Sequence, residues 1–156
     1  MRPDLRHRLP NPRRTALIPD LRHDHVPFVD SLTTILDPSL PLTVTEWEEW
    51  GNPLDDAQVY AYMKAYSPYE NIGDRAYPPI LAITSLNDTR VLYHEPAKWI
   101  ARLRATASGG PFLLKTEMEA GHGGRSGRYD AWLEEALVLA WVVETPAAGL
   151  TDRIGR

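Results

Sequence analysis

The chain has 156 residues, which suits one domain, and 43% of them are hydrophobic, which is enough for a folded core. It contains no cysteine, which excludes disulfides, thiolate metal sites and a cysteine nucleophile and agrees with a cytoplasmic location. No apolar run approaches the roughly 20 residues of a membrane helix, and residues 1–25 show no signal peptide, so we expect no membrane partner.

Charge is unevenly distributed along the chain. Residues 1–25 carry six arginines and three aspartates, whereas residues 26–156 carry 11 basic and 18 acidic residues. The stretch between His23 and Met63 holds eight acids and neither Lys nor Arg. Such a segment attracts cations and is a poor partner for nucleic acid, although a solvated acidic face is the commoner explanation.

Residues 1–25 differ in kind from the rest. They contain four prolines and six arginines, and they show neither a helical nor an alternating apolar period. Proline removes a backbone donor and disfavours helix in the residue before it. We therefore expect a disordered or foreign leader, with regular structure starting near Val26.

Beyond Val26 the pattern predicts helices over residues 30–36 and 55–66, and then a loop over 67–79 that is punctuated by prolines. The apolar run 80–85 predicts a strand buried on both faces. Pro96 at a first helical position predicts a helix to about Ala107, and residues 112–117 form the next expected strand.

The last helix has the clearest period, with apolar residues at spacings of three and four. We expect it to end near Glu144, before Pro146, and residues 146–156 to form a loose tail. The apolar stripe comprises Tyr129, Trp132, Leu133, Ala136, Leu137, Ala140 and Trp141.

Strand, helix, strand and helix in short alternation predict an α/β fold with a parallel pair of strands. Two strands do not make a stable doubly covered sheet alone, so we expect a sheet larger than the one this chain supplies.

Asp88 and His122 each follow a predicted strand. The carboxyl ends of parallel strands are where α/β folds place their sites, and an acid followed by a glycine-flanked histidine is the back half of a Ser-Asp-His arrangement read in chain order. Asp88 would hold the imidazole, and His122 would move the proton. If each residue is considered alone, Asp88 can be explained as part of an ordinary Asn-Asp turn and His122 as a histidine of a surface loop.

The serine that should precede this pair is missing. No Gly-x-Ser-x-Gly turn occurs in the chain, and the nearest string, at 124–127, has the wrong spacing and follows the histidine.

An acidic and aromatic cluster lies at residues 46–50. Three carboxylates and two indoles suit a guanidinium or ammonium group, whereas an amphipathic turn with buried Trp and exposed Glu is slightly favoured on chemistry alone. Arg90 could donate to a peptide carbonyl or form a structural salt bridge. The string His23-Asp24-His25 lacks an obvious third ligand, so we expect no metal site and no cofactor.

Several strings resemble the C-terminal part of the catalytic domain in the prolyl oligopeptidase family of serine peptidases, in particular its oligopeptidase B (protease II) group. The likeness spans roughly residues 26–144. The matching strings lie at 26–30, 41–43, 48–53, 62–64, 66–69, 95–99 and 121–128.

The resemblance implies the C-terminal portion of an α/β-hydrolase fold, a partial parallel sheet with flanking helices, over residues 26–145. It implies cleavage of short peptides after Arg or Lys, with Asp88 and His122 as triad acid and base. Glu46 and Glu48 match the position that binds the basic side chain, and Arg90 matches an arginine that contacts the substrate backbone. The family's serine turn would lie upstream, which suggests a truncated or frameshifted reading frame.

Three functional hypotheses follow. The chain is a peptidase fragment that is inactive alone, half of a split peptidase whose serine comes from a separate upstream half, or a non-catalytic module that binds basic peptides.

Overall fold

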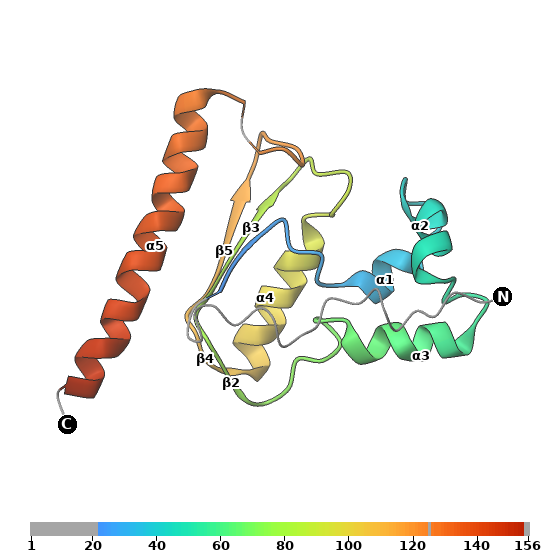
Figure 1. The fold of residues 1–156 in the computed structure, drawn as a ribbon, viewed down its shortest axis with the longest axis horizontal. Helices are drawn as coiled ribbons and strands as arrows, with labels where there is room; N and C mark the ends of the chain where they lie inside the picture. Colours follow the sequence, from blue (N-terminus) through green and yellow to red (C-terminus); the bar gives the residue numbers. More distant parts are fainter. Residues whose placement is uncertain (1–21, 125, 155–156) are drawn as a thin grey trace.

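A parallel sheet of three strands organises the computed structural model, which describes residues 22–124 and 126–154 (Figure 1). The strands stand in the order β1-β3-β5, so β3 is central. Ile80 of β3 lies opposite Phe112 of β5, and Ser85 lies opposite Glu117. The strands are β1 (Arg22–His25), β3 (Ile80–Ser85) and β5 (Phe112–Glu117).

Strand β3 is buried along its whole length, as predicted. Ile80 and Ala82 pack in the cluster that contains helix α4 (His94–Thr106), whereas Leu81 and Ile83 pack against helix α5 (Arg128–Ile154). Successive side chains of a strand point to opposite faces, so a continuous apolar run needs a cover on both. Figure 1 shows α4 and α5 on opposite sides of the sheet.

Helix α4 presents Trp99, Ile100 and Leu103 to the sheet, as the spacing predicted. The helix begins at His94, two residues before the predicted start at Pro96. Proline is tolerated there because the first-turn N–H groups have no acceptor within the helix.

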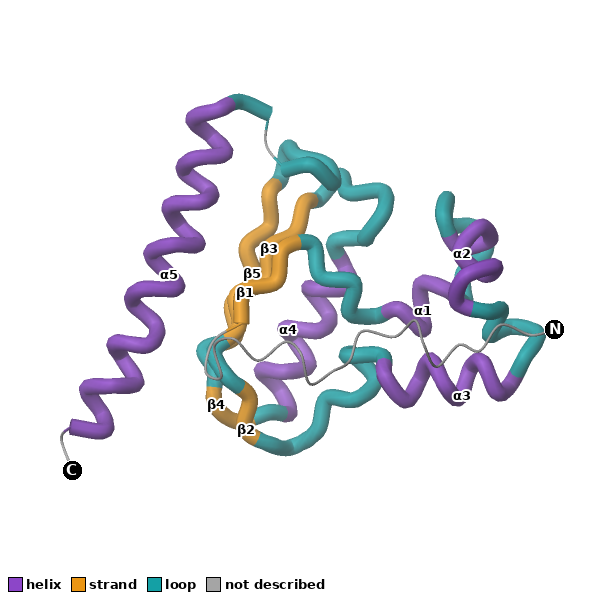
Figure 2. The backbone as a smooth tube through the Cα atoms, in the orientation of Figure 1, coloured by secondary structure: helices purple, strands orange, loops and turns teal. Residues whose placement is uncertain are grey.

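A second layer of short helices lies beyond α4 and shares a core built on Leu32, Ile35 and Met63 (Figure 2). Helix α3 starts after Asp56, whose carboxylate accepts hydrogen bonds from two backbone N–H groups. The layer consists of α1 (Ser31–Ile35), α2 (Thr43–Trp50) and α3 (Ala57–Tyr66).

Helix α2 was not predicted as an element, although the period of a helix is present in its sequence. Thr43, Trp47 and Trp50 recur at spacings of four and three, which is the signal of one helical face. Thr43 is buried and both indoles pack in the second layer.

The expected boundaries of the folded region were wrong at both ends. Strand β1 lies inside the segment expected to be a leader, and residues 1–21 lie outside the described residues. Helix α5 does not end near Glu144 but runs to Ile154, so residues 146–154 are helical where a loose tail was expected. A proline inside a helix removes one backbone donor and adds strain without forbidding continuation.

Two further strands of two residues each were not predicted: one lies in the expected loop 67–79, and the other lies between the expected helix and the strand at 112–117. They pair in parallel, and Gly109 approaches the partner so closely that a Cβ on it would lie 2.3 Å from the Tyr77 carbonyl oxygen. These strands are β2 (Ala76–Tyr77) and β4 (Ser108–Gly109).

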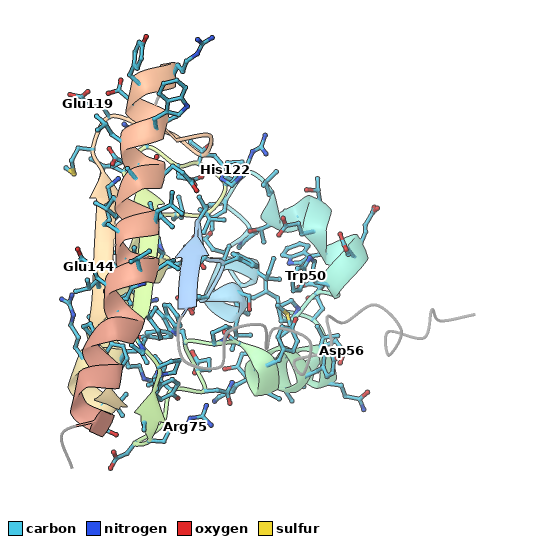
Figure 3. All side chains as sticks on the ribbon, turned by 60° about the vertical axis from the view of Figure 1, so that its left-hand side comes forward. Trp50, Asp56, Arg75, Glu119, His122 and Glu144 are labelled. Atoms are coloured by element: carbon cyan, nitrogen blue, oxygen red, sulfur yellow. The ribbon has the colours of Figure 1, made fainter. Side chains whose placement is uncertain are left out.

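The predicted apolar stripe of α5 is largely the outer face of the helix. Tyr129, Trp132 and Leu133 are 74%, 60% and 69% exposed, whereas Val138 and Val142 on the opposite side pack against the sheet. Figure 3 views the molecule from the side of α5. Of the predicted stripe, Trp141 packs with that inner cluster, so α5 carries apolar residues on two opposite faces.

No helix among the described residues combines the length and the apolar content that crossing a bilayer requires.

Replacing Leu103 with alanine should lower the free energy of unfolding by about 2–5 kcal/mol, because its fully buried side chain would leave a cavity between α4 and the sheet. Leu133→Ala, on the exposed face of α5, should change it by less than about 0.5 kcal/mol. Urea denaturation of both variants measures the difference. Equal losses would contradict the packing described here.

Candidate active site

The loops after β3 and β5 emerge side by side because the two strands are parallel neighbours. The strand pairing continues into the loops, where the Leu86 N–H donates to the Glu117 carbonyl at 2.8 Å and the Asn87 N–H donates to the Ala120 carbonyl at 3.3 Å. These bonds bring Asp88, on the first loop, to the loop after β5.

Asp88 and His122 form a hydrogen-bonded pair. His122 Nδ1 lies 2.9 Å from Asp88 Oδ2 and 3.1 Å from Oδ1. The Asp88 side chain is fully buried, whereas 39% of the His122 side chain is exposed. Figure 3 shows His122 at the end of the sheet toward which the strands point. The histidine is therefore held on its buried side and accessible on the other.

The backbone of its own loop fixes the Asp88 carboxylate. The N–H groups of Arg90 and Val91 donate to Oδ1 at 2.8 and 3.1 Å. Burial raises the pKa of Asp88, but these two bonds and the contact with His122 outweigh it and leave the pKa below its ordinary value. These two donors were not predicted, although an aspartate that begins a turn commonly accepts a hydrogen bond from the N–H two residues on.

An ionised Asp88 accepts from Nδ1–H of His122, which leaves Nε2 as the basic nitrogen of the neutral ring. A base oriented in this way takes a proton from a nucleophile and returns it to a leaving group. The arrangement has the geometry that an acid and base pair in acyl transfer requires.

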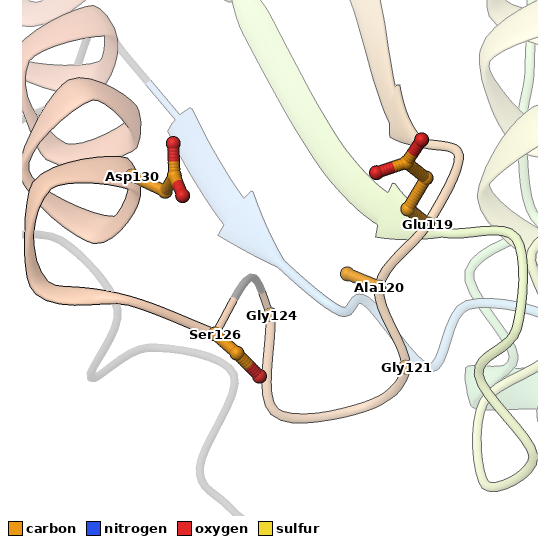
Figure 4. Close-up of a pocket in the computed structure, with 6 residues that line it drawn as sticks. All are labelled: Glu119, Ala120, Gly121, Gly124, Ser126 and Asp130. Atoms are coloured by element: carbon orange, nitrogen blue, oxygen red, sulfur yellow. The ribbon is translucent and has the colours of Figure 1, made fainter.

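The loop of His122 is closed by a turn in which the Gly124 N–H donates to the Gly121 carbonyl at 3.1 Å. Gly124 has a φ of 75°, a conformation that favours glycine. Ser126 follows this turn, is exposed, and lines a cavity together with Glu119 and Asp130 (Figure 4). Within the described residues, no hydrogen bond joins Ser126 to His122, so its geometry is not that of an activated nucleophile.

Glu46 and Arg90 line one small pocket between α2 and the loop of Asp88, together with Thr43 and Thr89. Burial raises the pKa of Glu46, and the nearby Glu49 carboxylate raises it further. None of the ion pairs found among the described residues involves Arg90. The pocket thus joins an acid and a guanidinium 44 positions apart in the sequence.

Glu48 and the two indoles lie as the favoured interpretation of the cluster predicted, with the Trp rings packed inside and Glu48 exposed. Glu48 is exposed and does not line the pocket of Glu46. The Trp47 indole donates to the Ile35 carbonyl at 3.0 Å, and the Trp50 ring packs edge-on against Phe28 with centroids 6.0 Å apart. Both rings therefore serve the helical layer.

Several of the other acids between His23 and Met63 also have structural partners. Asp30 is buried and paired with Lys98, Asp37 accepts from Ser39, and Asp56 caps α3. Nowhere in the described ranges do three or more His, Asp or Glu side chains gather in a way that could hold a metal ion.

Asp88→Asn should lower the free energy of unfolding at pH 6 by about 1–3 kcal/mol, because a buried acceptor of three hydrogen bonds loses its charge. A depressed carboxyl pKa contributes stability that is present above the ordinary value of 3.8 and lost as the pH falls through the folded-state value. The difference between wild type and variant should therefore shrink on acidification below pH 3.8, as measured by urea titrations at a series of pH values.

Glu48→Gln, at an exposed side chain, provides the control and should change the free energy of unfolding at pH 6 by less than about 0.5 kcal/mol. A difference for Asp88→Asn that stays constant at all pH values would show that the carboxylate charge is not what the site uses.

Comparison with known proteins places this geometry in a family. Residues 23–148 match the prolyl oligopeptidase family. Dipeptidyl aminopeptidase BI of Pseudoxanthomonas mexicana and Protease 2 of Moraxella lacunata are each 49% identical over 120 residues, which are 76% of this chain and 16% and 17% of theirs. The chain therefore spans about a sixth of the length of the curated relatives it matches.

Solved structures agree. Oligopeptidase B from Leishmania major superposes with a TM-score of 0.78 at 44% identity, over 81% of this chain and 18% of that one. Oligopeptidase B from Trypanosoma brucei, in a closed form with covalently bound antipain, gives 0.75 at 44% identity, over 79% and 17%. The expected α/β-hydrolase fold is confirmed, and the chain belongs to the prolyl oligopeptidase family of serine peptidases, in which it is similar to oligopeptidase B.

Proposed function

We propose that this chain is the acid- and base-bearing part of a serine-type oligopeptidase that cleaves peptides after Arg or Lys, and that it is inactive alone. One observation carries the proposal: Asp88 and His122 are hydrogen-bonded as a triad acid and base in a chain that has no Gly-x-Ser-x-Gly turn.

The missing hydroxyl decides the activity of the isolated chain. In an assembled site, His122 Nε2 would accept the proton of the attacking serine, and Asp88 would stabilise the imidazolium. Without a serine there is no bond to the substrate carbonyl carbon and no acyl-enzyme. Triad members act as a unit, so a site that holds only two of the three does not retain a proportional share of the catalytic rate.

The pocket of Glu46 and Arg90 supports the preference for basic residues. A half-buried carboxylate recognises a guanidinium or ammonium through charge-assisted hydrogen bonds. Arg90 would donate to a carbonyl of the substrate backbone. Glu48 is exposed and does not line this pocket, so its proposed part in binding rests on the family resemblance alone. The names of the two relatives at 49% identity state no preference for Arg or Lys, so the preference is argued from this pocket.

The isolated chain should release no product from an arginyl dipeptide reporter and should take no label from a fluorophosphonate probe. The physical reason is the missing activated hydroxyl. A fluorogenic assay and gel fluorescence measure the two outcomes. Labelling that disappears in Ser126→Ala would contradict the proposal, because it would identify Ser126 as a working nucleophile.

Binding of Nα-acetyl-arginine amide should weaken on acidification at a higher pH than for an ordinary glutamate, whose pKa is 4.5. The cation needs an ionised Glu46, and a carboxyl with a raised pKa takes up its proton earlier as the pH falls. The Glu46→Gln variant should bind the arginine amide about tenfold more weakly at pH 7, and its affinity should no longer fall on acidification. Calorimetry at several pH values measures both effects, and an unchanged profile would remove Glu46 from the site.

A split peptidase is the second candidate, and two surfaces favour it. Among the described residues β1 pairs on one edge, with β3, and the outer face of α5 exposes apolar side chains. Open strand edges and apolar faces invite a partner that extends the sheet. An upstream half of the same enzyme, carrying the serine, would pair with the open strand edge and cover the apolar face of α5. Mixing the two halves should restore arginyl hydrolysis, and its failure would count against complementation.

A non-catalytic module that holds short basic peptides is the third candidate. It shares the pocket of Glu46 and Arg90 with the first, so binding of a basic peptide alone does not separate the two. Tight binding in calorimetry together with no hydrolysis after mixing with an upstream half would favour the module. The cytoplasmic location stays a prediction.

A further inference from the structure

Glu95 is a buried charged residue that the proposed chemistry does not use. It lies in the first turn of α4, seven positions after Asp88, and its exposed fraction is 0%. Charged side chains are almost never fully buried unless they are paired or hydrogen-bonded. The position of this carboxyl therefore needs an explanation.

Both oxygens of Glu95 bind helix α1, on a different segment of the chain. Oε2 accepts from the backbone N–H of Asp30 at 3.0 Å, and Oε1 accepts from the hydroxyl of Thr34. These partners stand at the start of α1 and near its end. Lys98, one turn further along α4, pairs with the Asp30 carboxylate. The beginning of α4 thus holds α1 at both ends.

Helix α1 in turn holds α2. The Thr43 hydroxyl donates to the Thr34 carbonyl at 3.0 Å, and the Trp47 indole donates to the Ile35 carbonyl at 3.0 Å. Thr43 and Trp47 flank Glu46 on α2. A continuous series of hydrogen bonds therefore runs from Glu95 to the helix that carries the pocket acid.

The other wall of the same pocket leads directly into α4. Thr89 and Arg90 line it from the loop that ends where α4 begins, and Thr34 lines it beside Glu46. Thr34 thus contacts Glu95 through its hydroxyl and also contributes to the pocket.

A contribution to the stability of the fold does not by itself explain why a glutamate is buried at position 95. Desolvation raises the pKa of Glu95, although the bonds from Thr34 and Asp30 oppose it. A buried carboxyl that is costly to ionise is weak evidence of stabilisation, and its best supported use is to specify one arrangement.

We propose that Glu95 is a positioning residue, which holds α1 and through it α2 so that Glu46 faces Arg90 across the substrate pocket. This inference rests on the proposed function for the role of Glu46 and Arg90. The structural connection from α4 to α2 depends only on the hydrogen bonds described above.

The test uses the full chain with Glu95→Gln and Thr34→Val, which alter the two sides of the same contact, and Ile83→Val as a control in the core between β3 and α5. Amide hydrogen exchange reports on α2 through the N–H groups of Glu46 and Gly51, and on the sheet through Ile80 and Leu86. Both network variants should speed exchange in α2 about tenfold relative to the sheet, whereas the control should not.

The second readout is the ratio of affinities for Nα-acetyl-arginine amide and its neutral analogue Nα-acetyl-citrulline amide. This ratio should fall about tenfold in Thr34→Val and stay unchanged in Ile83→Val. If Glu95→Gln fails to fold, Thr34→Val decides. Exchange that rises equally in α2 and the sheet would overturn the proposal and leave Glu95 a residue of general stability.

The two ideas fail in different ways. A wild-type chain that binds the arginine and citrulline amides equally would refute the proposed pocket function, and the exchange pattern would still decide whether Glu95 holds α2. Selective exchange in α2 without a change in the affinity ratio would refute the link between Glu95 and the pocket.

Discussion

The pairing of β3 with β5 is the constraint on which the candidate site depends. Residues 34 positions apart meet because two parallel strands end at the same edge, and hydrogen bonds from Leu86 and Asn87 continue the ladder into the loops. The register is set by burial on both faces of β3, since a slip of one residue would exchange the side chains that meet α4 and α5. The same slip would displace one loop by about 3.3 Å and break the Asp88–His122 contact.

The site then divides into two parts that different layers support. The acid and base pair is fixed by the sheet and by the backbone N–H groups of Arg90 and Val91. The pocket of Glu46 is supported by the helices beyond α4, which have a core of their own around Met63. Helix α4 belongs to both parts, because it follows the loop of Asp88, packs on the sheet through Leu103, and carries the carboxylate that binds α1. The Asp88–His122 pair and the pocket of Glu46 are thus linked structurally through this one helix.

The outer surface of α5 has a different character. A helix with apolar residues on two opposite faces is typical of a buried position, yet here one face packs on Leu81 and Ile83 and the other lies open. A small sheet covered on both sides also buries less surface per residue than a large domain does, so its stability margin is narrow. The open face of α5 is one of the surfaces on which the proposed split peptidase would assemble.

Local pattern determined the strands at 80–85 and 112–117 and the inward face of α4, because a continuous apolar run or a helical period is written in neighbouring residues. The order of Asp88 and His122 followed from their places after those strands, and the family followed from the resemblance of short strings. Local pattern could not place β1, whose four residues have no apolar period and become a strand only by pairing with β3. Nor could it choose which face of α5 packs, since both faces are apolar and only the sheet selects between them. Tertiary structure alone brought Glu46 to Arg90 and Glu95 to α1, because contacts between distant segments depend on how the layers pack.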